Sequence, residues 1–68
     1  MDYYDTWTTA ELYTELDTVA RALALTREQA TEAVNAGDVD TMLELTPGIR
    51  YYVARIAKVA GLIDSRPY

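Results

Sequence analysis

The stretch Ala33-Val34-Asn35-Ala36-Gly37-Asp38-Val39-Asp40 decides the fold, because it combines the signals that end one helix and start the next. Glycine readily adopts the left-handed backbone conformation of a helix C-cap, and Gly37 follows a long run of helix-forming residues. Asp38 is a good N-cap, and Asp40 places a negative charge in the first turn of the following segment. The sequence therefore predicts two helices joined by a tight turn at Gly37.

On both sides of Gly37, apolar or small side chains recur at alternating spacings of three and four residues, which is typical of packed helices. The first series consists of Leu12, Leu16, Val19, Leu23, Thr26, Ala30 and Ala33, and the second of Val39, Met42, Thr46, Ile49, Val53, Ile56, Ala60 and Ile63. Paired from Ala33 with Met42 to Leu12 with Ile63, the two series have a nearly constant sum of residue numbers, as an antiparallel pair requires. Neither segment alternates with period two. The predicted fold class is all-α, an antiparallel helical hairpin or small helical bundle.

Capping patterns give the expected bounds of the first helix. Thr8-Thr9-Ala10-Glu11 has the form of a capping box, which predicts a helix over about 8–36. Thr26-Arg27-Glu28-Gln29 repeats that form, so a break near 25–26 stays open as an alternative. That break would give a compact bundle of short helices in place of a long hairpin.

Proline gives the expected bounds in the second half of the chain. Pro47 favours the first turn of a helix over its interior, which predicts one helix over about 38–45 and another over about 47–60. The sequence 1–68 is interpreted as a single small helical domain, with an N-terminal aromatic arm at 1–7 and a C-terminal tail at 64–68.

Composition excludes several classes of protein. The 68 residues include neither cysteine nor histidine, so the sequence predicts no disulfide, no zinc site, no metal site and no cofactor. There is no long apolar run and no signal-peptide pattern, so we expect a cytoplasmic protein. Five arginines against one lysine, together with ten alanines, are typical of a bacterial or phage protein, which would act in the host cytoplasm if phage-encoded.

Self-association is expected because a chain of this size buries only enough apolar surface to offset roughly the entropy of ordering it. Each predicted helix also carries apolar residues beside its main series: Tyr13, Ala20 and Val34 on the first, and Leu45, Tyr52 and Val59 on the second. Charge is divided as well, with −8 over residues 1–46 (ten acids, two arginines) and +3 over 47–68 (four basic residues, one acid). These features predict a dimeric four-helix bundle or a higher assembly.

All the aromatic residues are tyrosine or tryptophan. These side chains combine an apolar ring with a polar group that can face water, so they are common at protein interfaces. The candidate partner-binding residues are Tyr3, Tyr4, Trp7, Tyr13, Tyr52 and Tyr68. The alternative for the N-terminal members is an arm that closes the open end of the hairpin.

A second candidate site lies on one face of the second helix, where Tyr51, Arg55 and Lys58 are spaced i, i+4 and i+7, with Arg50 beside them. A nucleotide base can stack on tyrosine while Arg and Lys hold phosphate. One alternative is an ion-pair surface against the acidic first helix, within the hairpin or between subunits, and another is contact with an acidic patch on a partner protein. The net charge of −5 argues against duplex DNA, whose binding needs many phosphate contacts.

The function predicted from these features is a non-enzymatic protein–protein interaction module. A small regulator, an adaptor or a phage-encoded inhibitor of a host protein, acting by surface occlusion, would fit. One alternative is an oligomeric binder of a nucleotide-type or signalling ligand, and another is a structural subunit of a larger assembly. No nucleophile motif or glycine-rich loop indicates catalysis.

Overall fold

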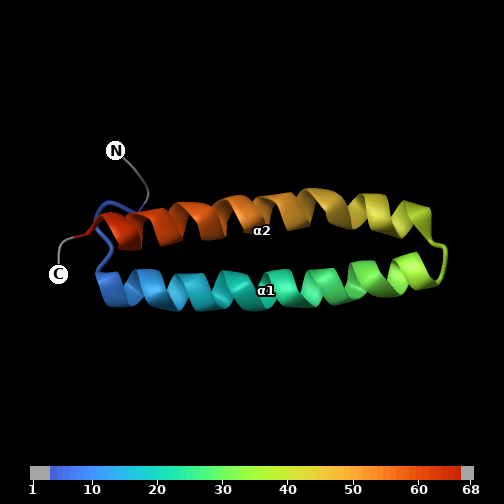
Figure 1. Ribbon diagram of the computed structural model, residues 1–68, viewed down its shortest axis with the longest axis horizontal. Coiled ribbons are helices and arrows are strands. Elements are labelled where there is room, and N and C mark those ends of the chain that lie inside the picture. The colour runs from blue at the N-terminus through green and yellow to red at the C-terminus, as the bar shows by residue number, and fades with distance from the viewer. Residues whose placement is uncertain (1–3, 67–68) are drawn as a thin grey trace.

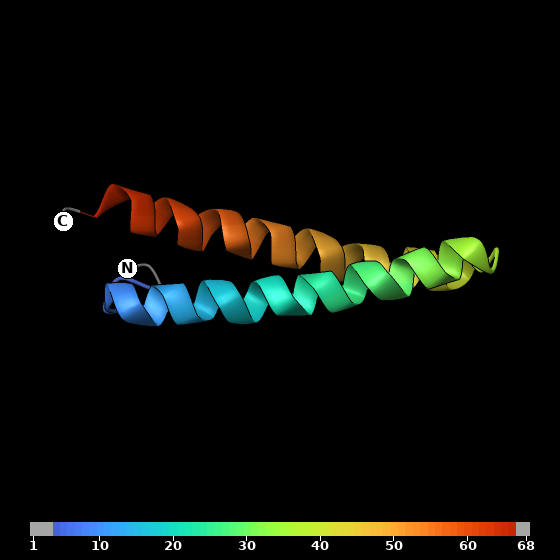
Figure 2. The same cartoon turned by 60° about the horizontal axis from the view of Figure 1, so that its bottom comes forward.

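The computed structural model describes residues 4–66, and they form two antiparallel helices. Helix α1 spans Thr9–Asn35 and helix α2 spans Val39–Ser65. The helices lie side by side along their whole length (Figures 1 and 2), in a rod whose extents are 47 × 20 × 14 Å. The predicted all-α class and the helical hairpin are confirmed.

The turn between the helices is a Schellman motif, in which backbone groups past the helix end bond back to its last carbonyls. The Asp38 N–H donates to the Ala33 carbonyl at 2.8 Å, and the Gly37 N–H donates to the Val34 carbonyl at 3.1 Å. Gly37 has the positive φ, 69°, that this motif requires. The residues predicted to end α1 therefore do so by the expected backbone conformation.

Side chains cap the start of each helix. In α1, the Glu11 N–H donates to Thr8 Oγ1 at 3.1 Å and the Thr8 N–H donates to Glu11 Oε1 at 2.9 Å, which completes the predicted capping box. In α2, Asp38 accepts from the backbone N–H and from the hydroxyl of Thr41. These bonds lower the pKa of both carboxyl groups, so the stability they provide is present at neutral pH and is lost as the pH falls through the lowered values.

Helix α1 is continuous through the second capping pattern, so the alternative of a break near 25–26 is wrong. The Thr26 hydroxyl donates to the Ala22 carbonyl at 2.9 Å, within the same helix, and does not cap a new one. Thr26 is partly buried between Leu23 and Ala30 in the series that faces α2. A continuous helix keeps that whole series on one side, which is the physical reason the local pattern is overridden.

Helix α2 is also continuous, which corrects the prediction of separate helices over 38–45 and 47–60. Pro47 lies inside α2, and the helix extends to Ser65. Proline removes the N–H that would bond to the Leu43 carbonyl. Both Leu43 and Pro47 are exposed, so water can satisfy that carbonyl. Met42, Thr46 and Ile49 continue the contact with α1 across the proline, and this packing favours a single helix.

The residues of α1 that face α2 are the predicted ones, whereas those of α2 that face α1 are only partly the predicted ones. Every member of the first series is buried or half-buried. In α2, by contrast, Val39, Val53 and Ala60 are exposed. The residues that the sequence analysis placed beside this series, Leu45, Tyr52 and Val59, turn toward α1 instead, and Val59 is fully buried. Because leucine, tyrosine and valine bury more apolar surface than two valines and an alanine, this rotation of α2 is favourable.

The N-terminal segment closes the end of the hairpin opposite the turn. In Figure 1 it crosses from the start of α1 toward the end of α2. Tyr4 is 4% exposed and packs with Leu12 and Val59, and Trp7 packs against this cluster. The rings of Tyr4 and Trp7 meet edge to face at a centroid distance of 4.9 Å. The arm thereby extends the small core beyond the two helices. Among the described residues, no helix is long and apolar enough to cross a membrane.

Substitution of two glycines by alanine tests whether the turn requires glycine at position 37. A methyl group added at Gly37 or at Gly61 would meet no neighbouring atom, but only Gly37 has a positive φ. We expect Gly37→Ala to lower the free energy of unfolding by about 1–2 kcal/mol, because an L-residue is strained there. We expect Gly61→Ala, inside α2, to raise it by about 1 kcal/mol.

Urea unfolding followed by circular dichroism measures both changes under the same conditions. Equal effects of the two substitutions would contradict the assignment of Gly37 as the residue that permits the turn.

Candidate interaction surfaces

An ion pair joins the two helices at the side where the N-terminal arm lies. Arg55 Nη2 of α2 donates to Glu15 Oε2 of α1 at 2.9 Å. The side chains of Glu15 and Arg55 are only 14% and 28% exposed, respectively. A pair this sheltered from water is screened less than a surface pair, so it contributes more to holding the helices in register.

Two tyrosines surround this ion pair. Arg55 also donates to the Tyr51 hydroxyl, and its guanidinium carbon lies 5.6 Å from the ring centroid of Tyr4 and 5.7 Å from that of Tyr51. The Tyr4 hydroxyl donates to Glu15 Oε2 at 3.4 Å. Arg55 is therefore held by a carboxylate, a hydroxyl and two aromatic rings, which belong to one residue of the arm, one of α1 and one of α2.

The pKa values of this cluster reflect its composition. The hydrogen bond from Arg55 to Glu15 raises the pKa of the guanidinium, so Arg55 stays charged. Burial raises the pKa of the Tyr4 hydroxyl, which stays neutral. The Arg55 Nε atom is buried and has no hydrogen-bond partner. At neutral pH the cluster therefore holds a charged Arg55 and a neutral Tyr4.

Of the residues predicted for the second site on α2, the structure brings together three and leaves Arg50 apart from them. Tyr51, Arg55 and Lys58 line a shallow hollow of about 310 Å³ together with Tyr4 and Ala54. Arg50 is exposed and is not among the residues that line the hollow. The ion-pair alternative describes the bonding that is seen, because the Arg55 charge already faces Glu15 across the hairpin.

The predicted aromatic surface is divided among different places. Tyr3 and Tyr68 lie outside the described residues. Tyr4 is buried in the arm, and Trp7 is half-buried beside it. Tyr52 is half-buried and meets Tyr51 edge to face at 5.6 Å. Tyr13 remains exposed, so the described aromatic candidates do not form one continuous patch.

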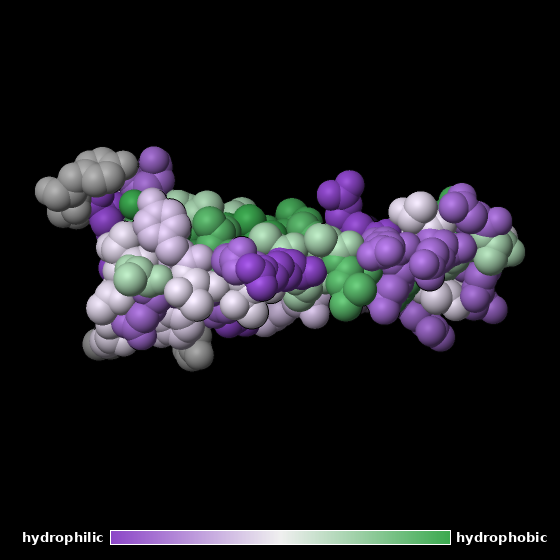
Figure 3. Space-filling view, turned by 90° about the horizontal axis from the view of Figure 1, so that it is seen from below, coloured by the Kyte–Doolittle hydropathy of each residue, from purple (hydrophilic) through white to green (hydrophobic). Residues whose placement is uncertain are grey.

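Another apolar surface, which the sequence analysis did not identify as a site, lies on the other side of the hairpin. We call it the side face and define it by Val34 of α1 and by Val39, Leu43 and Val53 of α2, which are 51–65% exposed. At about 100° per residue, Val53 and Arg55 point roughly 160° apart around α2, so the side face is away from the ion pair. Figure 3 shows hydrophobic residues along one edge in the middle of the molecule, whereas the turn end is mostly hydrophilic in this view.

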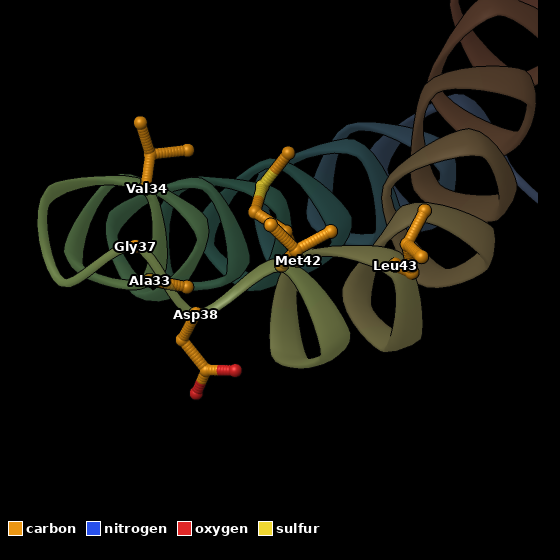
Figure 4. Close-up of a pocket in the computed structure, with 7 residues that line it drawn as sticks. Ala33, Val34, Gly37, Asp38, Met42 and Leu43 are labelled. Carbon is orange, nitrogen blue, oxygen red and sulfur yellow. The ribbon is translucent and has the colours of Figure 1, made fainter.

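The side face is hollowed near the turn. A hollow of about 260 Å³ is lined by Ala33, Val34, Gly37, Asp38, Val39, Met42 and Leu43. Figure 4 shows Val34, Met42 and Leu43 pointing to the same side, with the Asp38 carboxylate directed away from them. A second hollow, of about 300 Å³, shares Val34 and Met42 and is bordered by Arg27. The turn half of the side face therefore presents a nearly uncharged, indented apolar surface.

The sequence pattern of the side face was recognised, but its α2 residues were predicted to pack against α1. Val39 and Val53 were placed in the seam with α1, and Val34 was counted as surplus on the first helix. Leu43 lies four residues after Val39, on the same side of α2, and belonged to neither series. Choosing between two adjacent apolar stripes on α2 required the packed structure.

Comparisons of this chain with protein-family models, with curated proteins and with solved structures found no match. Within residues 4–66, no group of three or more acidic side chains is placed to hold a metal ion.

The ion pair can be tested with a double-mutant cycle of Glu15→Gln and Arg55→Met. We expect a coupling energy of about 1–2 kcal/mol in urea unfolding, because the two sheltered groups interact directly. The matched control is Asp17→Asn with Arg21→Met, a pair at 3.1 Å within α1 whose side chains are mostly exposed. That pair should couple by about 0.5 kcal/mol or less. Equal coupling in both cycles would show that the Glu15–Arg55 pair has no special role.

Proposed function

We propose that this chain is a non-enzymatic protein–protein interaction module that docks its side face onto a helical partner. Its mechanism is occlusion: the docked hairpin covers a surface of the partner. A small regulator, an adaptor or a phage-encoded inhibitor of a host protein works in this way. A structural subunit of a larger assembly would use the same face, and it differs in forming a permanent rather than a regulated contact.

The observation that carries the proposal is the exposure of the side face. Val34, Val39, Leu43 and Val53 come from both helices and lie on one side of the hairpin, where they are more than half exposed. Exposed apolar side chains gathered from two helices are typical of docking sites, and the exposed Arg50 lies on the same side of α2 between Leu43 and Val53. The hollows beside Val34 and Met42 offer places for a partner's side chains.

The shape of the molecule supports a helical partner. The hairpin is a single layer of two helices, 14 Å across its thinnest direction. A second pair of helices laid on the side face would form a four-helix bundle, the assembly that the sequence predicts. Helices pack at interaxial distances of about 8–10 Å, so such a layer would contact Val34 and Leu43 directly.

Binding of a nucleotide-type ligand is the second candidate function, and it is favoured by the hollow that Tyr4, Tyr51, Arg55 and Lys58 line. Against it, Glu15 already bonds to Arg55, so a phosphate would have to compete with that carboxylate. We expect a panel of nucleotides to leave the thermal unfolding temperature unchanged. A rise that Arg55→Met removes would instead establish this second function.

Capture of binding proteins from the host cell tests the main proposal, with two matched variants. Val34→Lys places a charge on the side face, whereas Leu25→Lys makes the same charge change at a position 58% exposed on the same helix. The two positions are nine residues apart, which is roughly 180° around α1. We expect a stoichiometric partner to be retained by the wild type and by Leu25→Lys, and to be lost with Val34→Lys.

Retention by both variants would show that the side face is not the docking surface. A folded control is needed for each, and circular dichroism should give the same helix content for all three proteins because both positions are exposed.

A further inference from the structure

We propose that the partner of the side face is an acidic amphipathic helix, whose apolar stripe covers the face and whose flanking carboxylates bind two arginines there. This inference rests on the proposed function, since it names the chemistry of the partner for the same face. It is argued from the positions of the two arginines, from their lack of partners within the hairpin and from the sign of the charge on the face.

The two arginines are Arg27 of α1 and Arg50 of α2. Arg27 precedes Val34 by seven residues, which is two helical turns, so the two share one side of α1. Arg50 follows Leu43 by the same interval and shares one side of α2 with it. Arg27 also lines a hollow together with Ile49, the neighbour of Arg50. The arginines therefore lie at about the same level of the hairpin, one on each helix.

Neither of these arginines has a partner within the described part of the chain. Both are exposed, and neither guanidinium forms an ion pair or a hydrogen bond there. By contrast, Arg21 pairs with Asp17 at 3.1 Å. Arg55 pairs with Glu15 at 2.9 Å. A guanidinium has five N–H donors and can hold a carboxylate through two parallel hydrogen bonds. The side face thus offers two arginines whose bonding capacity the hairpin does not use.

The charge that the side face presents is of one sign. Among the residues that line its two hollows, Asp38 is the only acid, and its carboxylate is directed away from Val34 and Met42 (Figure 4). In a two-fold dimer this face would meet itself, so the arginines would find no carboxylate from the lining of the hollows. An amphipathic helix with acidic flanks supplies both an apolar stripe and the missing carboxylates.

The net charge of −5 does not decide the partner at contact distance. Exposed charges more than about 8 Å apart are largely screened at physiological salt. Glu28 and Glu32 lie about 120–160° around α1 from Val34, so a docked carboxylate would be closer to the arginines than to them. Two arginines are few for an anionic membrane or a nucleic acid, whose binding depends on many basic contacts. A protein segment is therefore favoured.

Selection from a peptide library tests the chemistry of the partner. The library consists of helical peptides with one apolar stripe, whose flanking positions vary among glutamate, glutamine and lysine, and the target is the full chain. We expect the enriched peptides to carry glutamate at these positions. We expect Leu43→Ser to weaken their binding, because this change removes exposed apolar surface from the side face.

Titration of an enriched peptide tests the two arginines one at a time. Arg27→Glu and Arg50→Glu should each raise its dissociation constant about tenfold, because a carboxylate would then face the glutamates of the peptide. Arg21→Glu is the matched control, with the same charge change about 140° around α1 from Val34, and it should change the constant less than about twofold. Circular dichroism should give the same helix content for all the variants, since the three arginines are exposed.

Enriched peptides with glutamine or lysine at the flanks would overturn the proposal, and so would equal effects of Arg21→Glu and Arg50→Glu. Binding to vesicles of anionic lipid that Arg50→Glu abolishes would assign the face to a membrane and overturn it as well. A failure of the proposed function gives a different result, in which Leu43→Ser leaves peptide binding unchanged. Uncharged peptides that Leu43→Ser weakens would leave the docking surface standing, with a partner of different chemistry.

Discussion

A pair of helices can bury only the stripe of each that faces the other, and this geometric constraint shapes the rest of the structure. Helix α2 has apolar residues over a wider arc than α1 can cover, so part of that arc must face solvent. The packing resolves the conflict by burying Leu45, Tyr52 and Val59 and leaving Val39, Val53 and Ala60 outside. The exposed side face is the direct consequence, and it is the feature on which the proposed docking depends.

The two long sides of the hairpin differ in character for a physical reason. On one side, the arm residue Tyr4 covers the junction of the helices, and the Glu15–Arg55 pair links them through sheltered charges. Polar groups there are already bonded to each other, so a new partner would have to break those bonds before making its own. On the other side, the side chains of Val34 and Leu43 are apolar and hold no hydrogen bond that docking would have to break. Docking is therefore favoured on the apolar side.

Much of the hairpin was predictable because its signals are local. Thr8, Glu11, Gly37 and Asp38 act through contacts with residues three to five positions away, so their roles can be seen in the sequence itself. The continuous second helix was not predictable in the same way. Pro47 is a local signal for a helix start, and it is outweighed by packing of Met42 and Ile49 against α1, a contact between distant parts of the chain.

The sequence by itself determined that this protein is all-helical, where the turn at Gly37 lies and which residues of α1 face α2. It also placed Tyr51, Arg55 and Lys58 on one face. Only the tertiary structure decided that Arg55 bonds to Glu15, forty positions away, and which of two adjacent stripes on α2 becomes the surface. Helical periodicity indicates which residues share a face, but the rotation of a helix about its axis is set by the total apolar area that packing buries.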